Sequence, residues 1–124
     1  PALYHEKDGI WEGGSISQFT PVMMFKLWEK FSDNAIWRRK DSEKWYGILL
    51  RVKASKLGLD DDKLIEILDL RIKTEDIEST VDNKCFFPGY HMNKKHWYTL
   101  LLDGTTTIEE ICRRIDESYL LAKI

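Results

Sequence analysis

The side chains best suited to chemistry lie close together, in the run Pro-Gly-Tyr-His-Met-Asn-Lys-Lys-His-Trp at residues 88–97. This run holds two of the three histidines of the chain, and His91 and His96 are five residues apart. That spacing does not place both imidazoles on one face of a helix, and no cysteine or carboxylate lies beside them. The run therefore predicts no metal site, and we expect no cofactor.

Covalent catalysis by a cysteine is a second chemistry to consider. It would require Cys85 or Cys112 to approach a histidine together with a third, orienting group. Cys112 falls on the apolar face of a predicted helix, where a buried thiol is inert. Two free thiols are the simpler interpretation. Because no base, nucleophile or cofactor loop can be assigned, we expect that the protein is not an enzyme.

Phosphate binding fits the run better. Lys94 and Lys95, together with Asn93 and His96, offer several hydrogen-bond donors, and a predicted basic hairpin could bring further cations to the same phosphate oxygens. Aromatic side chains beside them could stack on nucleic-acid bases where they are exposed. The candidate nucleic-acid or ligand-binding residues are Tyr90, His91, Asn93, Lys94, Lys95, His96, Trp97, Arg38, Arg39 and Lys44.

The same run could instead have a structural role. Tyr90, Met92 and Trp97 would then pack beneath the C-terminal helix, while His91 and Asn93 would satisfy buried backbone groups in the turn. Both interpretations hold together if alternate side chains face opposite ways.

The elements that must position this run begin with an N-terminal arm. Residues 1–19 carry three glycines and several turn signals, which predict an irregular or extended arm with one short strand at most. Thr20 and Pro21 are typical of a helix start, and apolar residues at spacings of three and four predict a helix that ends at residues 32–34. We therefore divide the chain into an arm, residues 1–19, and a single domain, residues 20–124.

The middle of the chain predicts strands. Residues 35–40 and 45–52 are rich in β-forming residues and flank a polar turn, as in a β-hairpin. The second strand predicts one apolar face, in a sheet that is covered mainly on one side. This face consists of Tyr46, Ile48, Leu50 and Val52. The apolar run at residues 63–72 fits either helical or strand periodicity, and we interpret it as a strand.

The C-terminal part of the chain closes with the clearest helix. Thr74 is expected to cap a short helix, and residues 98–102 predict a strand. Thr107 and Glu110 then form a capping box that starts a terminal helix. Its apolar face consists of Ile108, Ile111, Cys112, Ile115, Tyr119 and Ala122. This order of elements predicts an α+β fold, with one antiparallel sheet and helices on one face.

The composition is that of one compact soluble domain. The chain has 124 residues, 43% of them hydrophobic, and a formal net charge of -2. It holds no apolar run of about 18 residues that could cross a bilayer, so we expect a cytoplasmic protein without a membrane partner. The near-neutral charge argues mildly against a dedicated nucleic-acid binder, because such proteins usually carry net positive charge.

Residues 90–97 and the segments around them resemble the MmcQ/YjbR family. The matching segments are residues 28–31, 34–38, 44–46, 56–59, 101–104 and 117–119, so that the resemblance covers roughly residues 28–124. It implies a two-layer α+β fold of the frataxin-like (CyaY-like) type, an antiparallel sheet backed by N- and C-terminal helices, with a strand at residues 63–72. Members of this family are often labelled DNA-binding. Residues 1–20 depart from the family pattern.

Two functional hypotheses follow. The first is a non-enzymatic module that binds DNA through phosphate contacts from residues 90–97 and the basic hairpin. The alternative is a protein-interaction or small-ligand-binding module, because the near-neutral charge and the many aromatic residues suit a partner surface. Some members of the family carry this module behind another domain, so a preceding domain is a further expected partner.

Overall fold

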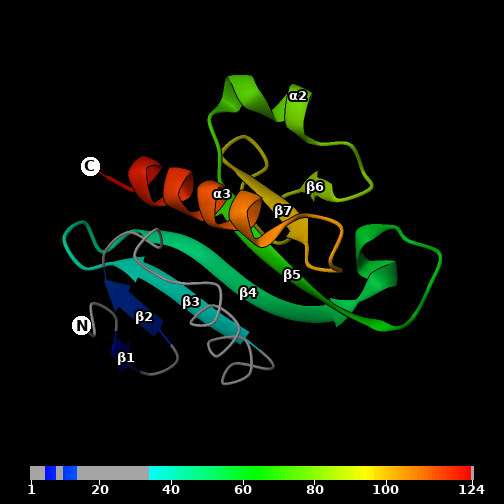
Figure 1. Cartoon of the computed structure of the whole chain (residues 1–124), viewed down its shortest axis with the longest axis horizontal. Coiled ribbons are helices and arrows are strands. Elements are labelled where there is room, and N and C mark those ends of the chain that lie inside the picture. The colour runs from blue at the N-terminus through cyan, green and yellow to red at the C-terminus, as the bar shows by residue number, and fades with distance from the viewer. Residues whose placement is uncertain (1–4, 8–9, 14–33, 124) are drawn as a thin grey trace.

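The structure is a computed structural model, and it describes residues 5–7, 10–13 and 34–123. These residues form an α+β fold in which helix α3 lies across one face of a β-sheet (Figure 1). The strands are β1 (His5–Lys7), β2 (Ile10–Gly13), β3 (Asn34–Arg39), β4 (Trp45–Lys53), β5 (Leu64–Arg71), β6 (Phe86–Pro88) and β7 (Trp97–Leu101). The helical elements are η2 (Ala54–Leu57), η3 (Thr74–Asp76), α2 (Ile77–Thr80) and α3 (Ile108–Leu121). The predicted fold class is confirmed.

The strands form one sheet in the order β1-β2-β3-β4-β5-β7-β6. The five strands from β3 to β7 pair antiparallel, as predicted. The helix predicted to follow Thr20 lies outside the described residues. A sheet backed by helices from both ends of the chain, of the frataxin-like type, therefore stays a prediction.

The N-terminal arm contributes two strands where the sequence predicts one at most. β1 pairs antiparallel with β2, and β2 pairs parallel with β3, with Trp11 opposite Trp37. Residues 5–7 and 10–13 are therefore extended, which the prediction of an extended or irregular arm allows, but they form one strand more than expected. Pairing with a distant strand decides whether such a short segment becomes a strand.

The predicted hairpin is confirmed as β3 and β4, but the single apolar face predicted for β4 is wrong. Trp37 pairs with Gly47 and Arg38 pairs with Trp45, so Tyr46 is an extra residue in β4. Such a β-bulge shifts the alternation of side chains. Tyr46 consequently packs beneath α3, while Leu50 and Val52 pack on the opposite face.

The sheet is buried on both faces. The helix-side core lies between the sheet and α3, and it consists of Trp37, Tyr46, Leu49, Leu68, Leu70, Ile72, Tyr98, Leu100, Ile111, Ile115 and Ala122. The far-side core consists of Ile67, Phe87 and Leu101, with Leu50, Val52, Leu57, Leu59, Ile65 and Tyr90 packed against them. The expectation of a sheet covered mainly on one side is therefore wrong.

Residues 64–71 form β5, so the predicted strand at residues 63–72 is confirmed. The predicted strand at residues 98–102 is β7, which begins one residue earlier, at Trp97. The predicted capping role of Thr74 is wrong, because Lys73 stands at the N-cap of η3 and no side chain makes a cap hydrogen bond there. The hydroxyl of Thr74 instead donates to the carbonyl oxygen of Lys95 at 2.7 Å.

Thr107 caps helix α3 as predicted, but the described structure shows only this half of the predicted capping box. The hydroxyl oxygen of Thr107 accepts a hydrogen bond from the backbone N–H of Glu110 at 3.2 Å. The Glu110 carboxylate bonds Arg113 and Arg114, and these bonds lower its pKa to about 2. Both cysteines of the chain are free and half-buried, as the sequence predicts.

A polar residue inside the helix face was not predicted. Ser118 is fully buried, donates to the carbonyl oxygen of Tyr46 at 2.5 Å and accepts from the backbone N–H of Arg71 at 2.8 Å. One hydroxyl therefore fastens α3 to both β4 and β5. Ile108, by contrast, is 37% exposed and contributes less to the apolar face than its spacing predicts.

Candidate functional site

Residues 89–96 form a loop between β6 and β7, here called the motif loop. Its backbone is held by hydrogen bonds within the loop. The backbone N–H of Lys95 donates to the side-chain oxygen of Asn93 at 2.8 Å, and that of His96 donates to the Asn93 carbonyl oxygen at 3.1 Å. The carbonyl oxygen of His96 accepts from the backbone N–H of Ile72 at 3.0 Å. The loop therefore has a defined conformation that is fastened to the end of β5.

A buried polar chain anchors the start of the motif loop. The backbone N–H of Tyr90 donates to the hydroxyl oxygen of Thr99 at 2.8 Å, and that hydroxyl donates to Oδ1 of Asp69 at 2.5 Å. Asp69 is fully buried, and within the described residues its Oδ2 has no hydrogen-bond partner. Burial raises the pKa of Asp69 to about 7, although the Thr99 bond and the charge of Lys94 act against this rise.

The side chains of the motif loop point outward for the most part. Five of the predicted site residues in this loop are exposed, namely His91, Asn93, Lys94, Lys95 and His96. The Lys94 ammonium donates to the carbonyl oxygen of Gly89 at 3.1 Å. Tyr90 is half-buried against the far-side core, and its ring stacks on His91 with centroids 4.1 Å apart.

Trp97 has a structural position. It is only 5% exposed, and the Arg71 guanidinium lies over its ring at 4.7 Å from the centroid. Trp97 alternates with Tyr98, which packs beneath α3, so its side chain belongs to the opposite face of the sheet. The expectation that Tyr90 and Trp97 pack beneath the terminal helix is therefore wrong, because both lie on the far side.

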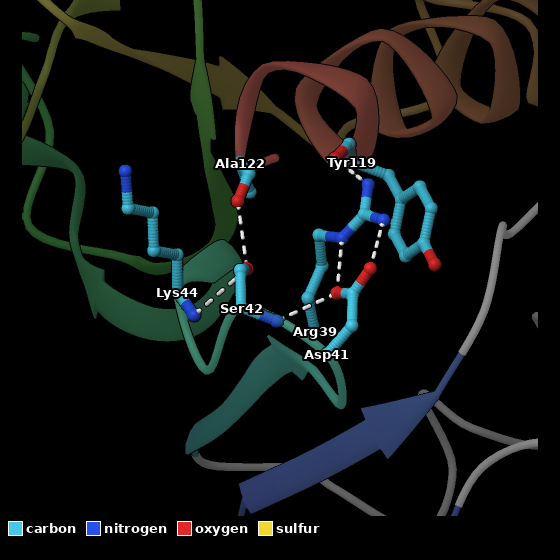
Figure 2. A network of polar contacts seen from close by, with 6 residues as sticks. All are labelled: Arg39, Asp41, Ser42, Lys44, Tyr119 and Ala122. Carbon is cyan, nitrogen blue, oxygen red and sulfur yellow. Dashed lines mark hydrogen bonds and ion pairs between the residues drawn. The ribbon is translucent and has the colours of Figure 1, made fainter. Parts of the chain in front are cut away.

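The basic hairpin contains a buried arginine. Arg39 is 6% exposed, and its guanidinium binds both carboxylate oxygens of Asp41 at 2.7 and 2.6 Å (Figure 2). It also donates to the Tyr119 carbonyl oxygen at 2.8 Å and lies over the Tyr119 ring. The guanidinium holds the pKa of the Asp41 carboxyl well below its usual range. Arg39 thus joins the hairpin to the end of α3.

The other predicted hairpin residues differ from Arg39 and from each other. Lys44 is exposed, and its side chain points away from Arg39 and Asp41 in Figure 2. Arg38 is half-buried. The neighbouring Ser42 hydroxyl donates to the Ala122 carbonyl oxygen at 2.7 Å, which adds a second bond to the end of α3. Among the predicted hairpin cations, Lys44 is therefore the one most open to a ligand.

The motif loop borders an open hollow with a volume of about 310 Å³. The hollow is lined by Lys56, Leu57, Asn83, Phe87, Pro88, Gly89, Tyr90, His91 and Lys94. Three of these, Tyr90, His91 and Lys94, are predicted site residues, and no acidic residue is among the nine. The strand pairing places the hairpin turn and the motif loop at the same end of the sheet, but the hairpin residues do not line the hollow.

Sequence reasoning missed several residues of this hollow. Lys56 and Leu57 belong to a segment that supports the family resemblance, yet nothing in that segment indicates a site. Asn83 and Phe87 precede the motif closely, but their types alone suggest no chemistry. Within the described residues, no group of three or more histidine, cysteine, aspartate or glutamate side chains is placed to hold a metal ion. None of the described helices is long and apolar enough to span a membrane.

With an antiparallel sheet packed against a C-terminal helix, the chain is a small α+β protein, and its loop between β6 and β7 carries exposed histidines and lysines. The family model for YjbR matches residues 23–121, and the chain belongs to this family.

Its relatives include bacterial proteins. The chain is 38% identical over 96 residues to the uncharacterized protein YyaQ of Bacillus subtilis, a match that covers 77% of this chain and 81% of YyaQ. A crystal structure of a Pseudomonas syringae protein is 40% identical, with a TM-score of 0.70, and covers 77% of this chain and 82% of that one. A solution NMR structure from the same organism is 35% identical, with a TM-score of 0.67 and coverage of 90% and 94%.

Proposed function

We propose that this protein is a non-catalytic binding module that contacts the phosphate backbone of DNA through the motif loop. The observation that carries the proposal is the division of labour in this loop, where the backbone is fixed and the polar side chains are exposed. No residue from 83 to 102 is acidic. Fixed donors without a nearby carboxylate suit phosphate oxygens.

Lys95 and His96 are the central contact residues in this proposal. Both are exposed, and neither side chain has a hydrogen-bond or ion-pair partner within the described part of the chain. Lys44, at the same end of the sheet, is a secondary contact. Contacts to phosphate carry no sequence information, so we expect little sequence preference. Arg39 and Trp97 are left out of the contact surface because both are buried.

A backbone-amide NMR titration with a short random-sequence duplex, at low and then at moderate salt, tests this function. We expect shifts concentrated at residues 90–97 that disappear as salt rises. The logarithm of the binding constant should fall with the logarithm of salt concentration, with a slope of about -0.9 for each phosphate contact. An absence of shifts in the motif loop at low salt would contradict the proposal.

A pair of charge reversals sharpens this test. Lys95→Glu should weaken duplex binding and reduce the salt slope, because it replaces a phosphate contact with a like charge. Lys53→Glu makes the same charge change at an exposed lysine at the opposite end of β4. It should leave the phosphate contacts of the motif loop intact. Equal weakening by both variants would mean that overall charge, and not the motif loop, determines binding.

A further inference from the structure

The hollow beside the motif loop collects polar groups that the fold does not use. Lys56, Asn83 and His91 all line it, and their side chains carry an ammonium, an amide and an imidazole. Within the described residues none of these three side chains has a hydrogen-bond or ion-pair partner. A fourth group, the Lys94 ammonium, donates one hydrogen bond to the Gly89 carbonyl oxygen. The polar lining is therefore rich in donors and available to a ligand.

The nearest acidic residue in sequence is engaged elsewhere. Oδ1 of Asp82 accepts hydrogen bonds from the backbone N–H groups of Lys84, Cys85 and Phe86, at 2.8, 3.0 and 3.0 Å. These bonds, that of Phe86 first, hold the pKa of the Asp82 carboxyl below its usual value. Its charge organises the turn before β6, so the hollow keeps an excess of positive charge.

The backbone at the hollow is unusual. Three non-glycine residues of the described chain have positive φ, and two of them, Asn83 at 58° and His91 at 59°, line the hollow. The third, Glu43, lies in the hairpin turn. Left-handed backbone at side-chain-bearing residues is uncommon and tends to gather at binding sites, where the surrounding structure enforces it. Asparagine and histidine are among the non-glycine types that adopt this conformation most readily, and here it sets the course of the backbone beside the hollow.

A second hollow provides a contrast. It has a volume of about 420 Å³ and is lined by Lys63, Glu66 and Asp103 together with apolar residues of β5 and β7. Its charges are of both signs, and none of its lining residues has positive φ. Size alone therefore does not distinguish the hollow at the motif loop, whereas charge and backbone conformation do.

We propose that the hollow at the motif loop binds a small organic anion, a phosphate or carboxylate group carried on a compact planar ring. The anionic group would face Lys56, Lys94 and His91, and the ring would lie against the apolar lining from Leu57 and Phe87. The volume is near the lower end of the range of about 300 to 1,000 Å³ for ligand pockets, which suits a ligand of one ring. The site shares His91 and Lys94 with the motif loop but goes beyond the DNA contact, because it also relies on Lys56, Leu57 and Phe87 outside that loop.

The test is an amide NMR titration of the full chain with four compounds: phenyl phosphate, benzoate, inorganic phosphate and phenol. We expect saturable shifts at Asn83 and His91 with a ringed anion, with a dissociation constant between about 10 μM and about 1 mM. Inorganic phosphate should bind at least about tenfold more weakly, and phenol should give no saturable shift. Comparing phenyl phosphate with benzoate identifies which anionic group the site prefers.

Two exposed lysines separate this site from the DNA surface. Lys56→Gln should weaken binding of the ringed anion by about tenfold, because it removes a charged donor from the lining. Lys95→Gln, the same change at a lysine that does not line the hollow, should leave that binding unchanged. No saturable shift with either ringed anion, or unchanged affinity in Lys56→Gln, would overturn the proposal. Failure of duplex binding would not overturn it, because Lys95 and His96, the central DNA contacts, do not line the hollow.

Discussion

The hairpin turn and the motif loop both carry basic residues at the same end of the sheet, but they use them in opposite ways. In the hairpin turn the side chains stabilise the fold, because Arg39 and Ser42 both donate hydrogen bonds to carbonyl oxygens at the end of α3. In the motif loop the stabilising hydrogen bonds are made mainly by backbone groups, and the side chains of Lys95 and His96 are left exposed. The basic side chains of a segment are therefore available as a candidate surface when other groups hold its backbone, as Asn93, Thr74 and Thr99 do here.

The nearest carboxylate explains the difference. Asp41 follows Arg39 by two residues and binds it with two hydrogen bonds, so the buried guanidinium is neutralised by a carboxylate that is itself exposed. A cation at a helix C-terminus is also favoured by the helix dipole. The motif loop has no acidic residue to neutralise its lysines, so burying them would leave unpaired charge, which is unfavourable.

The largest effect is expected from Arg39→Ala. The substitution removes a buried side chain, its bond to the Tyr119 carbonyl oxygen and its pair with Asp41, and should lower the free energy of unfolding by about 2 to 4 kcal/mol. Urea denaturation followed by circular dichroism measures it. Lys44→Ala, in the same turn but exposed, should change stability by less than about 0.5 kcal/mol. Equal effects of the two variants would show that Arg39 contributes no more to stability than an exposed lysine of the same turn.

The next effect concerns the pH dependence set by Asp69. Its folded-state pKa of about 7 lies above the ordinary value of 3.8, so between these values the folded protein holds a proton that the unfolded chain has lost. Stability therefore falls as pH rises, by about 2 to 3 kcal/mol between pH 5 and pH 8 from this group alone. Urea denaturation at several pH values across this range measures the effect. The free energy of unfolding of Asp69→Asn should depend less on pH than that of the wild type. A variant with the wild-type slope would refute the assignment.

A smaller effect is expected from cutting the anchor of the motif loop. Thr99→Val leaves the Tyr90 N–H and an Asp69 oxygen without their partner and should destabilise the protein by about 1 to 3 kcal/mol. It should also raise the pKa of Asp69 further, because the lost bond favours the ionised form. Thr74→Val removes the exposed second tie of the loop and should cost less than about 1 kcal/mol. Thermal denaturation of both variants decides whether the buried tie dominates.

The smallest effect is expected on the exposed face of the motif loop. Lys95→Gln and His96→Gln should each change the free energy of unfolding by less than about 0.5 kcal/mol, because neither side chain makes a bond within the described structure. Urea denaturation of these two variants together with Arg39→Ala compares their free energies of unfolding in one experiment. A loss as large as that of Arg39→Ala would show that the motif loop, too, uses its side chains for the fold.

Local signals were enough to predict most of the fold. The terminal helix was found from the Thr107 cap and its apolar spacing, and the hairpin from two β-rich runs around a polar turn. The prediction that Tyr46 shares one face of its strand with Leu50 and Val52 was wrong, because a β-bulge depends on how two strands pair. The role of Thr74 failed because its hydroxyl finds a carbonyl group from a distant loop. Both errors come from tertiary contacts that a local pattern does not contain.

The candidate site was predicted only in part for the same reason. The many polar and basic residues in residues 90–97 drew attention to this loop, and five of them are exposed, whereas a binding role for them stays a prediction. Residue type alone could not show that Arg39 and Trp97 are buried, although Asp41 beside Arg39 was a usable signal. Lys56 could not be found from the sequence, because only the fold brings it to the hollow.

The turn before β6 also closes one border of the sheet to other chains. β6 is an edge strand, and the N–H of Phe86 is bonded to Asp82, while its carbonyl oxygen accepts from the backbone N–H groups of Asp82 and Asn83. Alternate residues of β6 direct their N–H groups away from β7, so the residue that follows Phe86 in this respect is Pro88, which has no N–H. This edge therefore offers no free donor for strand addition, the usual route by which exposed sheet edges aggregate.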